Sequence, residues 1–168
     1  MKALVAVASK HGATLEMGRH LGDALAECGV EATVCPADQV TSLRNFDFVV
    51  LGTAVYANKM LPQMTALCYR FSDHLAHRPV YLFCSGPVDA AHPETVPMPM
   101  DARDLVRRVG VRGAKTFGGR LSFDLLRPTE RALMRMVGAR AGDYRDWDTV
   151  EDWARWVAED AASATRTS

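Results

Sequence analysis

The chain has 168 residues, of which 48% are hydrophobic and 24% charged, and its formal net charge at pH 7 is zero. This length favours a single domain with a sizeable core, and the composition is not that of a disordered or fibrous protein. The longest uncharged apolar stretch, residues 48–55, is too short to span a bilayer. No secretory leader is recognisable before the first apolar run, so we expect a cytoplasmic location.

The first half of the chain predicts three strands and two helices. Residues 2–8 form an apolar run typical of a buried strand, and 14–28 place apolar residues at helical spacing. The alternating segment 31–35 predicts a short second strand, and the apolar run 47–51 predicts a third, central one. Pro62 is suited to the first turn of the next helix.

The second half continues the alternation of strands and helices. Residues 79–84 predict a fourth strand, and 86–99, rich in proline without periodicity, predict a loop. A helix over 100–110 and a fifth strand over 114–121 follow. The last helix is predicted over 149–162, with Asp148 and Glu151 as its capping box.

Alternation of this kind indicates an α/β fold, a doubly wound five-stranded parallel sheet with helices on both faces. We expect one domain over residues 1–162 and a disordered tail over 163–168. Ligands of such sheets bind beyond the carboxyl ends of the strands. Three predicted loops leave strands at that edge and are the candidate binding elements.

The first of these loops has the features of a phosphate cradle. Small and polar residues, Ser9 to Thr14, lie between the first strand and its helix, where backbone N–H groups and the helix dipole favour an anion. The loop lacks the Gly-Lys-Ser/Thr ending of a P-loop and the G-x-G-x-x-G dinucleotide pattern. The alternative is an ordinary connecting loop with a helix cap.

The other two loops are suited to holding a ring system. Residues 52–58 are small apart from one aromatic, Tyr56, and the loop that opens at Ser85 is long enough to wrap a ligand. The candidate binding residues are Ser9, Lys10, His11, Gly12, Ala13, Thr14, Thr53, Ala54, Val55, Tyr56, Ala57, Ser85, Gly86 and Pro87. No catalytic side chain and no metal ligand is predicted.

The pattern Ser9-x-x-Gly-x-Thr14 resembles the FMN phosphate loop of flavodoxins, with Val7 where an aromatic residue is usual and Gly18 where alanine is usual. Similar motifs extend over nearly the whole chain. They are Gly52-Thr-Ala-Val-Tyr56, Leu61-Pro62, Ser85-Gly-Pro87, Gly118-Gly-Arg-Leu121 and Arg145-Asp-Trp-Asp148. Together they resemble the flavodoxin-like family that includes menaquinone-dependent protoporphyrinogen oxidase.

This resemblance implies a flavodoxin-like fold, FMN as cofactor and an oxidoreductase whose flavin oxidises a donor such as a porphyrinogen. A quinone or a redox protein would then accept the electrons. The alternative is a one-electron carrier without its own substrate, although shuttle flavodoxins are typically strongly acidic and this chain is neutral overall. A scaffold without flavin is a third reading. No nucleic-acid partner is expected.

Charge is distributed unevenly along the chain. Residues 103–145 hold 11 Lys and Arg against 4 Asp and Glu, whereas the remainder holds 9 against 16. Within this block, 122–140 combine arginines with apolar residues at helical spacing after Pro128. We expect a peripheral surface for an anionic membrane, on the inner face, or else a helix packed on the sheet with solvated arginines.

Cysteine, histidine and tryptophan complete the expectations. The cysteines form no C-x-x-C pair and lie in apolar contexts, so buried free thiols are expected. They are Cys28, Cys35, Cys68 and Cys84. The spacing of His74 and His77 predicts a solvated helix face rather than a metal site. Trp147, Trp153 and Trp156 are expected to be structural, the alternative being that Trp147 closes over the flavin.

Overall fold

The computed structural model of this chain describes residues 1–166 except 57, 87–97, 137 and 139. Five parallel strands form its main sheet in the order β2-β1-β3-β5-β6. Their bounds are β1 Lys2–Ala8, β2 Glu31–Pro36, β3 Phe48–Tyr56, β5 Val80–Gly86 and β6 Gly113–Gly118. The predicted doubly wound five-stranded sheet is therefore confirmed.

The central strands β1, β3 and β5 are covered on both faces, which explains why they are nearly continuous apolar runs rather than alternating ones. In the central strands, Val5 of β1 is paired with Val34 of β2 and with Val50 of β3. These residues are packed on one face of the sheet with Phe83. Their immediate neighbours in the chain are packed on the other face, so that each strand contributes to both cores.

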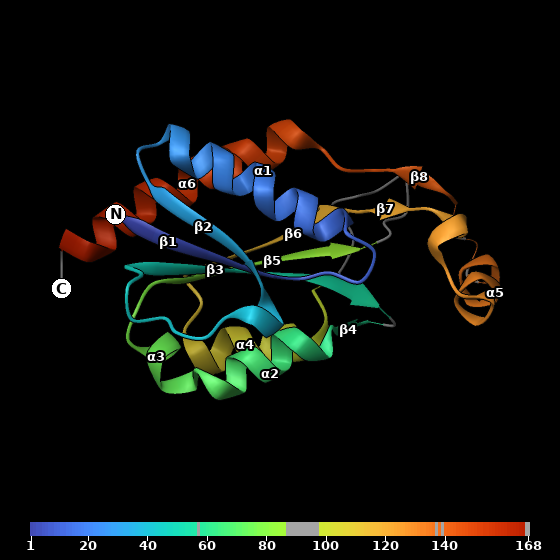
Figure 1. The fold of residues 1–168 in the computed structure, drawn as a ribbon, viewed down its shortest axis with the longest axis horizontal. Coiled ribbons are helices and arrows are strands. Elements are labelled where there is room, and N and C mark those ends of the chain that lie inside the picture. Colours follow the sequence, from blue (N-terminus) through green and yellow to red (C-terminus); the bar gives the residue numbers. More distant parts are fainter. Residues whose placement is uncertain (57, 87–97, 137, 139, 167–168) are drawn as a thin grey trace.

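The helices form two layers (Figure 1). One face of the sheet carries α1 (Ala13–Glu27) and α6 (Trp147–Arg166), which lie side by side. The other face carries α2 (Pro62–Arg70), α3 (Ser72–Ala76) and α4 (Met100–Val109). Both layers bury apolar side chains against the sheet, which makes the molecule a three-layer sandwich.

The predicted fifth strand is broken into two pieces. β6 ends at Gly118, and β7 (Arg120–Leu121) turns away to form an antiparallel ribbon with β8 (Gly142–Asp143). A short strand β4 (Lys59–Met60) similarly folds back on the end of β3.

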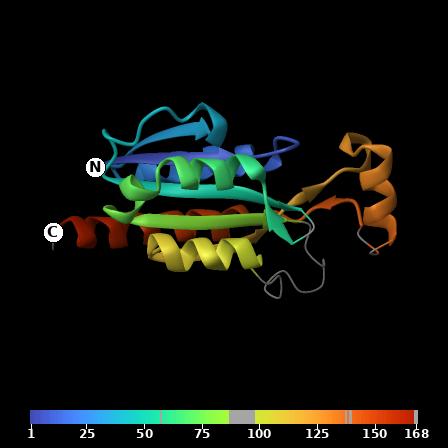
Figure 2. The same ribbon diagram turned by 90° about the horizontal axis from the view of Figure 1, so that it is seen from below.

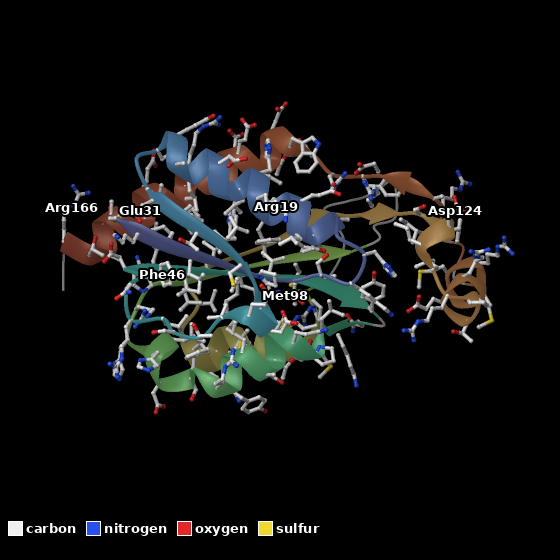
Figure 3. The ribbon with its side chains drawn as sticks, viewed as in Figure 1. Arg19, Glu31, Phe46, Met98, Asp124 and Arg166 are labelled. Carbon is white, nitrogen blue, oxygen red and sulfur yellow. The ribbon has the colours of Figure 1, made fainter. Side chains whose placement is uncertain are left out.

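Between β7 and β8 the chain forms what we call the arm, residues 120–143. It contains a 3-10 turn, Phe123–Leu125, and α5 (Pro128–Met136). The arm extends beyond the carboxyl edge of the sheet, at the opposite end of the molecule from both termini (Figures 1 and 2). In the side-chain view Asp124 of the arm and Arg166 accordingly lie at opposite ends (Figure 3). Because α5 stands clear of the sheet, it is not the sheet-packed helix that the sequence also allowed.

The last helix differs from its predicted bounds at both ends. Its cap is Asp146 rather than Asp148, because Asp146 accepts hydrogen bonds from Thr149 N (3.1 Å) and Thr149 Oγ1 (2.7 Å). Glu151 accepts instead from Arg155 and lies 3.0 Å from His20 Nε2. The helix continues to Arg166, so residues 163–166 are helical rather than part of a disordered tail, and 167–168 lie outside the described residues.

The sequence predicted buried free thiols. All four thiols are free, but only two of them are buried. Cys68 and Cys84 are buried, and burial raises the pKa of each thiol to about 12. Cys28 is exposed in the cap that ends α1, and Cys35 is half-buried on the edge strand β2. Within the described ranges no group of three or more His, Cys, Asp or Glu could hold a metal ion. No described helix is long and apolar enough to cross a membrane.

Candidate functional site

The loop after β1 owes its shape to Gly12. Gly12 has φ 86°, a left-handed conformation that glycine adopts without strain. Its N–H donates to Ser9 Oγ (3.1 Å), and its carbonyl accepts from Glu16 N (2.9 Å) in the first turn of α1. The chain therefore turns sharply from β1 into α1 and leaves the amino end of that helix at the carboxyl edge of the sheet.

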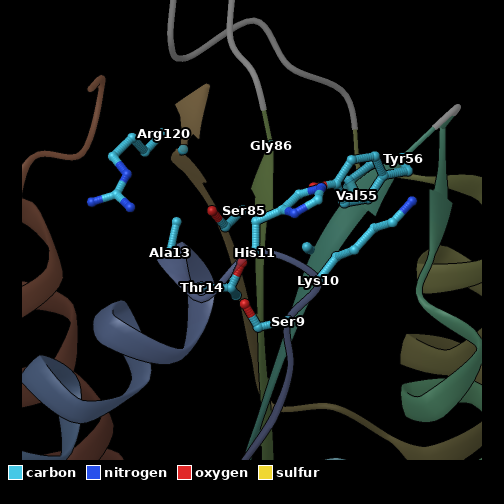
Figure 4. A pocket seen from close by; sticks show the side chains of 12 residues that line it. Ser9, Lys10, His11, Ala13, Thr14, Val55, Tyr56, Ser85, Gly86 and Arg120 are labelled. Carbon is cyan, nitrogen blue, oxygen red and sulfur yellow. The ribbon is translucent and has the colours of Figure 1, made fainter. Parts of the chain in front are cut away.

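A hollow opens at this edge, over the ends of β1, β3 and β5 (Figure 4). It has an empty volume of about 330 Å³, counting the part open to solvent. Its lining residues come from all three predicted loops and from the start of β7. They are Ser9, Lys10, His11, Ala13, Thr14, Ala54, Val55, Tyr56, Ser85, Gly86, Gly119 and Arg120.

Ten of the fourteen predicted binding residues line this hollow. Thr53 does not, because its buried hydroxyl donates to Ala54 O (3.0 Å) and accepts from Leu61 N (3.2 Å). These bonds join the end of β3 to the start of α2. Gly12 shapes the first loop without lining the hollow. Ala57 and Pro87 lie outside the described residues.

Aromatic and charged groups meet on one side of the hollow. Lys10 Nζ lies 5.1 Å from the centre of the Tyr56 ring, and the His11 ring centre lies 6.2 Å from it. Burial raises the pKa of the Tyr56 phenol, and the negative charge of Glu130 adds to the effect. Tyr56 is therefore a neutral phenol in the pH range of most cells.

Gly119 and Arg120 complete the lining and were not predicted as binding residues. Gly119 N donates to Gly86 O (2.8 Å), and a Cβ atom on Gly119 would lie only 2.8 Å from that same oxygen. The close approach brings the start of the arm against the end of β5. The Gly118-Gly119 pair was the available signal, because adjacent glycines in a strand often mark a close backbone approach.

The arm returns to the first loop through Glu130, which no sequence pattern singled out. Its carboxylate forms an ion pair with Lys10 and lies 4.0 Å from His11 Nε2. The hydrogen bond from Lys10 and that from Arg127 N hold the pKa of Glu130 below its usual value. His11 Nε2 itself is buried and has no hydrogen-bond partner within the described part of the chain.

Arg145 anchors the base of the arm to α1. Only 5% of its side chain is exposed, and it donates to Asp143 (2.5 Å) and to Glu16 (2.6 Å). Its guanidinium also lies 4.6 Å from the centre of the Trp147 ring. The bonds from Arg145 hold the pKa values of both carboxyl groups below their usual range.

The tryptophans lie away from the hollow. Trp147 is packed against Arg145 and His20, and Trp153 against Phe83 and Phe117 in the core. Trp156 is 42% exposed, with its edge against Tyr81. These contacts agree with structural roles for all three residues.

Comparison with known proteins identifies the class to which this fold and site belong. Residues 4–148 match the model of the flavodoxin domain family, and the chain is a member of that family. A search of curated proteins found no match.

Solved structures share the fold. A flavodoxin from the domain Archaea is 16% identical, with a TM-score of 0.66 over 96% of this chain and 99% of that one. A cysteine-to-serine mutant of flavodoxin from Pseudomonas aeruginosa is 20% identical, with a TM-score of 0.57 over 96% and 97%. Rubredoxin oxygen:oxidoreductase from Desulfovibrio gigas is 11% identical, with a TM-score of 0.67, and the chain spans only 36% of its length. At these identities the likeness concerns the fold.

Proposed function

We propose that this chain binds FMN in the hollow and acts as a flavodoxin-type electron carrier. One observation carries the proposal: the loops after β1, β3 and β5 converge on one hollow at the amino end of α1. That is where an α/β sheet of this topology binds its ligand. Membership of the flavodoxin domain family and the flavodoxins among its structural neighbours support the same function.

The residues of the first loop suit a phosphate group. The Ser9 and Thr14 side chains face the hollow beside the amino end of α1 (Figure 4), where free N–H groups and the helix dipole stabilise an anion. The buried, unpartnered Nε2 of His11 is a further polar atom at the same place. Tyr56 and Ser85 also line the hollow, and the aromatic ring of Tyr56 offers a surface against which a flat ring could stack. Bound FMN would supply the electron transfer, and these residues would bind and orient it.

The absorption spectrum of the purified protein tests this proposal, followed by titration with FMN and riboflavin. We expect a flavin spectrum, or reconstitution of one by FMN, and weaker binding of riboflavin because it lacks the phosphate. A potentiometric titration then gives the potentials at which the protein can exchange electrons. Failure of the protein to bind either flavin would favour a scaffold role and contradict the proposal.

A second candidate is an oxidase that uses the flavin on its own substrate, such as protoporphyrinogen, with a quinone as acceptor. The observation that favours it is charge: the chain is neutral overall and its arm is basic, whereas carriers that dock on basic partners are typically acidic. Turnover of protoporphyrinogen with a menaquinone analogue by the FMN-loaded protein tests it. Reduction of the flavin by a redox protein, without porphyrinogen turnover, would leave the carrier role.

We also propose that the arm is the surface that contacts an anionic membrane. It exposes Met136 (81%) and Leu125 (49%) to solvent, together with the exposed Arg127, Arg135 and Arg140. Apolar and cationic side chains side by side are what a helix needs at a membrane interface.

A further inference from the structure

Glu130 is a carboxylate of the arm that reaches the first loop, residues 9–14. It is paired with Lys10 and lies beside His11, and both of these residues line the hollow. A carboxylate is thus placed within contact distance of the two side chains of this loop that can carry positive charge. The Glu130 carboxylate therefore interacts with the same two side chains that a phosphate entering the hollow would meet.

The charge balance of the loop follows from this contact. Lys10 alone would attract a phosphate, but its charge is neutralised by Glu130. The pairing also favours the ionised form of Glu130, whose pKa is held below its usual value. A dianionic phosphate that enters the hollow therefore meets a lysine whose charge is already paired and a glutamate that is ionised. Repulsion between the phosphate and the Glu130 carboxylate opposes binding.

Few of the described residues hold α5 in place: Leu126 just before the helix is buried, and the Nε atom of Arg131 within it is enclosed. In both views α5 stands away from the sheet (Figures 1 and 2), and neither core cluster contains a described residue of α5. Its described side chains are exposed or half-buried. The pair between Glu130 and Lys10 is therefore a major link between α5 and the first loop, and its loss would loosen the helix.

We propose that Glu130 is an internal anion that competes with the ligand's phosphate for Lys10 and His11, and thereby lowers the preference of the hollow for phosphorylated ligands. The inference rests on the proposed FMN site for the identity of the ligand. The competition between Glu130 and a phosphate group does not depend on that identity. Binding of phosphate displaces the Glu130 carboxylate, gives His11 Nε2 the hydrogen-bond partner that it lacks among the described residues, and releases α5 from the loop.

Paired flavin titrations test the specificity. Glu130→Gln is expected to bind FMN about fivefold more tightly than the unmodified chain and to bind riboflavin within twofold of it, because only the phosphate is affected. Asp124→Asn is the matched control: it removes the same charge from an exposed position of the arm (Figure 3) and is expected to change neither affinity. The double variant Lys10→Gln/Glu130→Gln should lose most of the gain. Equal changes for FMN and riboflavin, or an equal gain in Asp124→Asn, would refute the proposal.

Limited trypsin digestion tests the release of the arm without a flavin. Inorganic phosphate is the probe, and cleavage after Arg131 and Arg135 is followed by mass spectrometry. We expect phosphate to accelerate these cuts in the unmodified chain, and Glu130→Gln to be cut rapidly with or without phosphate. Slower cutting in phosphate would mean that the arm closes on the ligand, which contradicts the proposal.

The two experiments separate this inference from the proposed function. If neither flavin binds but phosphate still accelerates the cuts, the FMN site is wrong and the competition stands. If FMN binds while Glu130→Gln alters neither its affinity nor the digestion, the FMN site stands and the competition is wrong.

Discussion

Thr14 is buried at 3% exposure in the first turn of α1 and lines the hollow. It is not the helix cap that its position in the sequence also allowed, because Gly12 is the N-cap and no side chain of the described residues makes a capping hydrogen bond there. Its side chain can therefore bind a phosphate through the hydroxyl, or serve only to pack the first turn of the helix.

Replacement of Thr14 by Ala separates these roles. We expect FMN affinity to fall at least tenfold, which corresponds to about 1.4 kcal/mol, because a donor to the phosphate is lost. Thr14→Ser keeps the hydroxyl and is expected to retain binding. A fluorescence titration measures both, and unchanged FMN affinity in Thr14→Ala would remove the hydroxyl from the binding site.

Asp160 illustrates a charge that acts on stability rather than on the site. It accepts from Arg112 Nε (2.6 Å) and from Tyr81 Oη (2.7 Å) at the end of the sheet opposite the hollow. The bond from Arg112, with a smaller contribution from Tyr81, lowers its pKa. A carboxyl group whose pKa is lower when folded stabilises the protein above its ordinary pKa, and this stabilisation is lost as the pH falls through the folded value.

Asp160→Asn should therefore lower the free energy of unfolding by about 1 kcal/mol at neutral pH. Below the ordinary Asp pKa of about 3.9, the difference from the unmodified chain should shrink as Asp160 itself becomes protonated. Urea unfolding at a series of pH values measures the gap. A gap that is constant down to the most acid condition would show that the lost interaction is not ionic.

At the scale of elements, the packing of α1 on β1 explains two departures from the flavodoxin pattern together. A Cβ atom on Gly18 would lie 2.5 Å from Val7 Cγ2, so Gly18, where alanine is usual, lies directly against Val7, where an aromatic residue is usual. The branched Val7 side chain occupies the space that a methyl group at position 18 would need. The two positions are therefore coupled.

Gly18→Ala tests this coupling. An exposed helix would gain about 1 kcal/mol from the change, but here overpacking is expected to destabilise the protein by about 1–3 kcal/mol. In a Val7→Ala background the same change should cost far less or become stabilising. Thermal unfolding of the four proteins completes a double-mutant cycle, and an equal cost in both backgrounds would mean that Val7 is not the obstacle.

Elements differ in how far the sequence predicts them. β1 and α4 were predicted within a residue because apolar periodicity is a local property. The cap of α6 was placed two residues too late, because Asp146 and Asp148 are equally plausible caps by type. The adjacent glycines Gly118 and Gly119 signal a close backbone approach where the fifth strand is broken. Their neighbours there, Tyr144 and Gly86, are distant in the chain, and no local pattern reveals them.

At the scale of the whole molecule, charge is divided between an acidic body and a basic region that includes the arm. The arm extends from the edge that also carries the hollow (Figure 1). A surface that contacts the arm would therefore lie close to the ligand, which suits a partner that exchanges electrons at a membrane.

Co-sedimentation with anionic liposomes tests the membrane surface. We expect weak binding at low salt that is lost at high salt, since each Lys or Arg near an anionic surface contributes about 1 kcal/mol. The triple variant Arg127→Gln/Arg135→Gln/Arg140→Gln should not sediment. Arg103→Gln/Arg107→Gln/Arg108→Gln on α4 removes the same charge and should sediment like the unmodified chain. Binding that is indifferent to the arm variant, or absent at low salt, would exclude the membrane role.

The order of strands and helices, the three loops and ten residues of the hollow could be derived from the sequence, because parallel strands necessarily bring their carboxyl ends to one edge. The positions of Gly119, Arg120 and Glu130 at the hollow could not be derived in this way, because they depend on where the arm folds back toward the sheet. Glu130 lies 120 residues from Lys10 in the chain, and their pairing requires Gly119 against Gly86 and Arg145 against Glu16. Local patterns record the propensity and burial of each segment, whereas such long-range contacts arise when the segments are packed together.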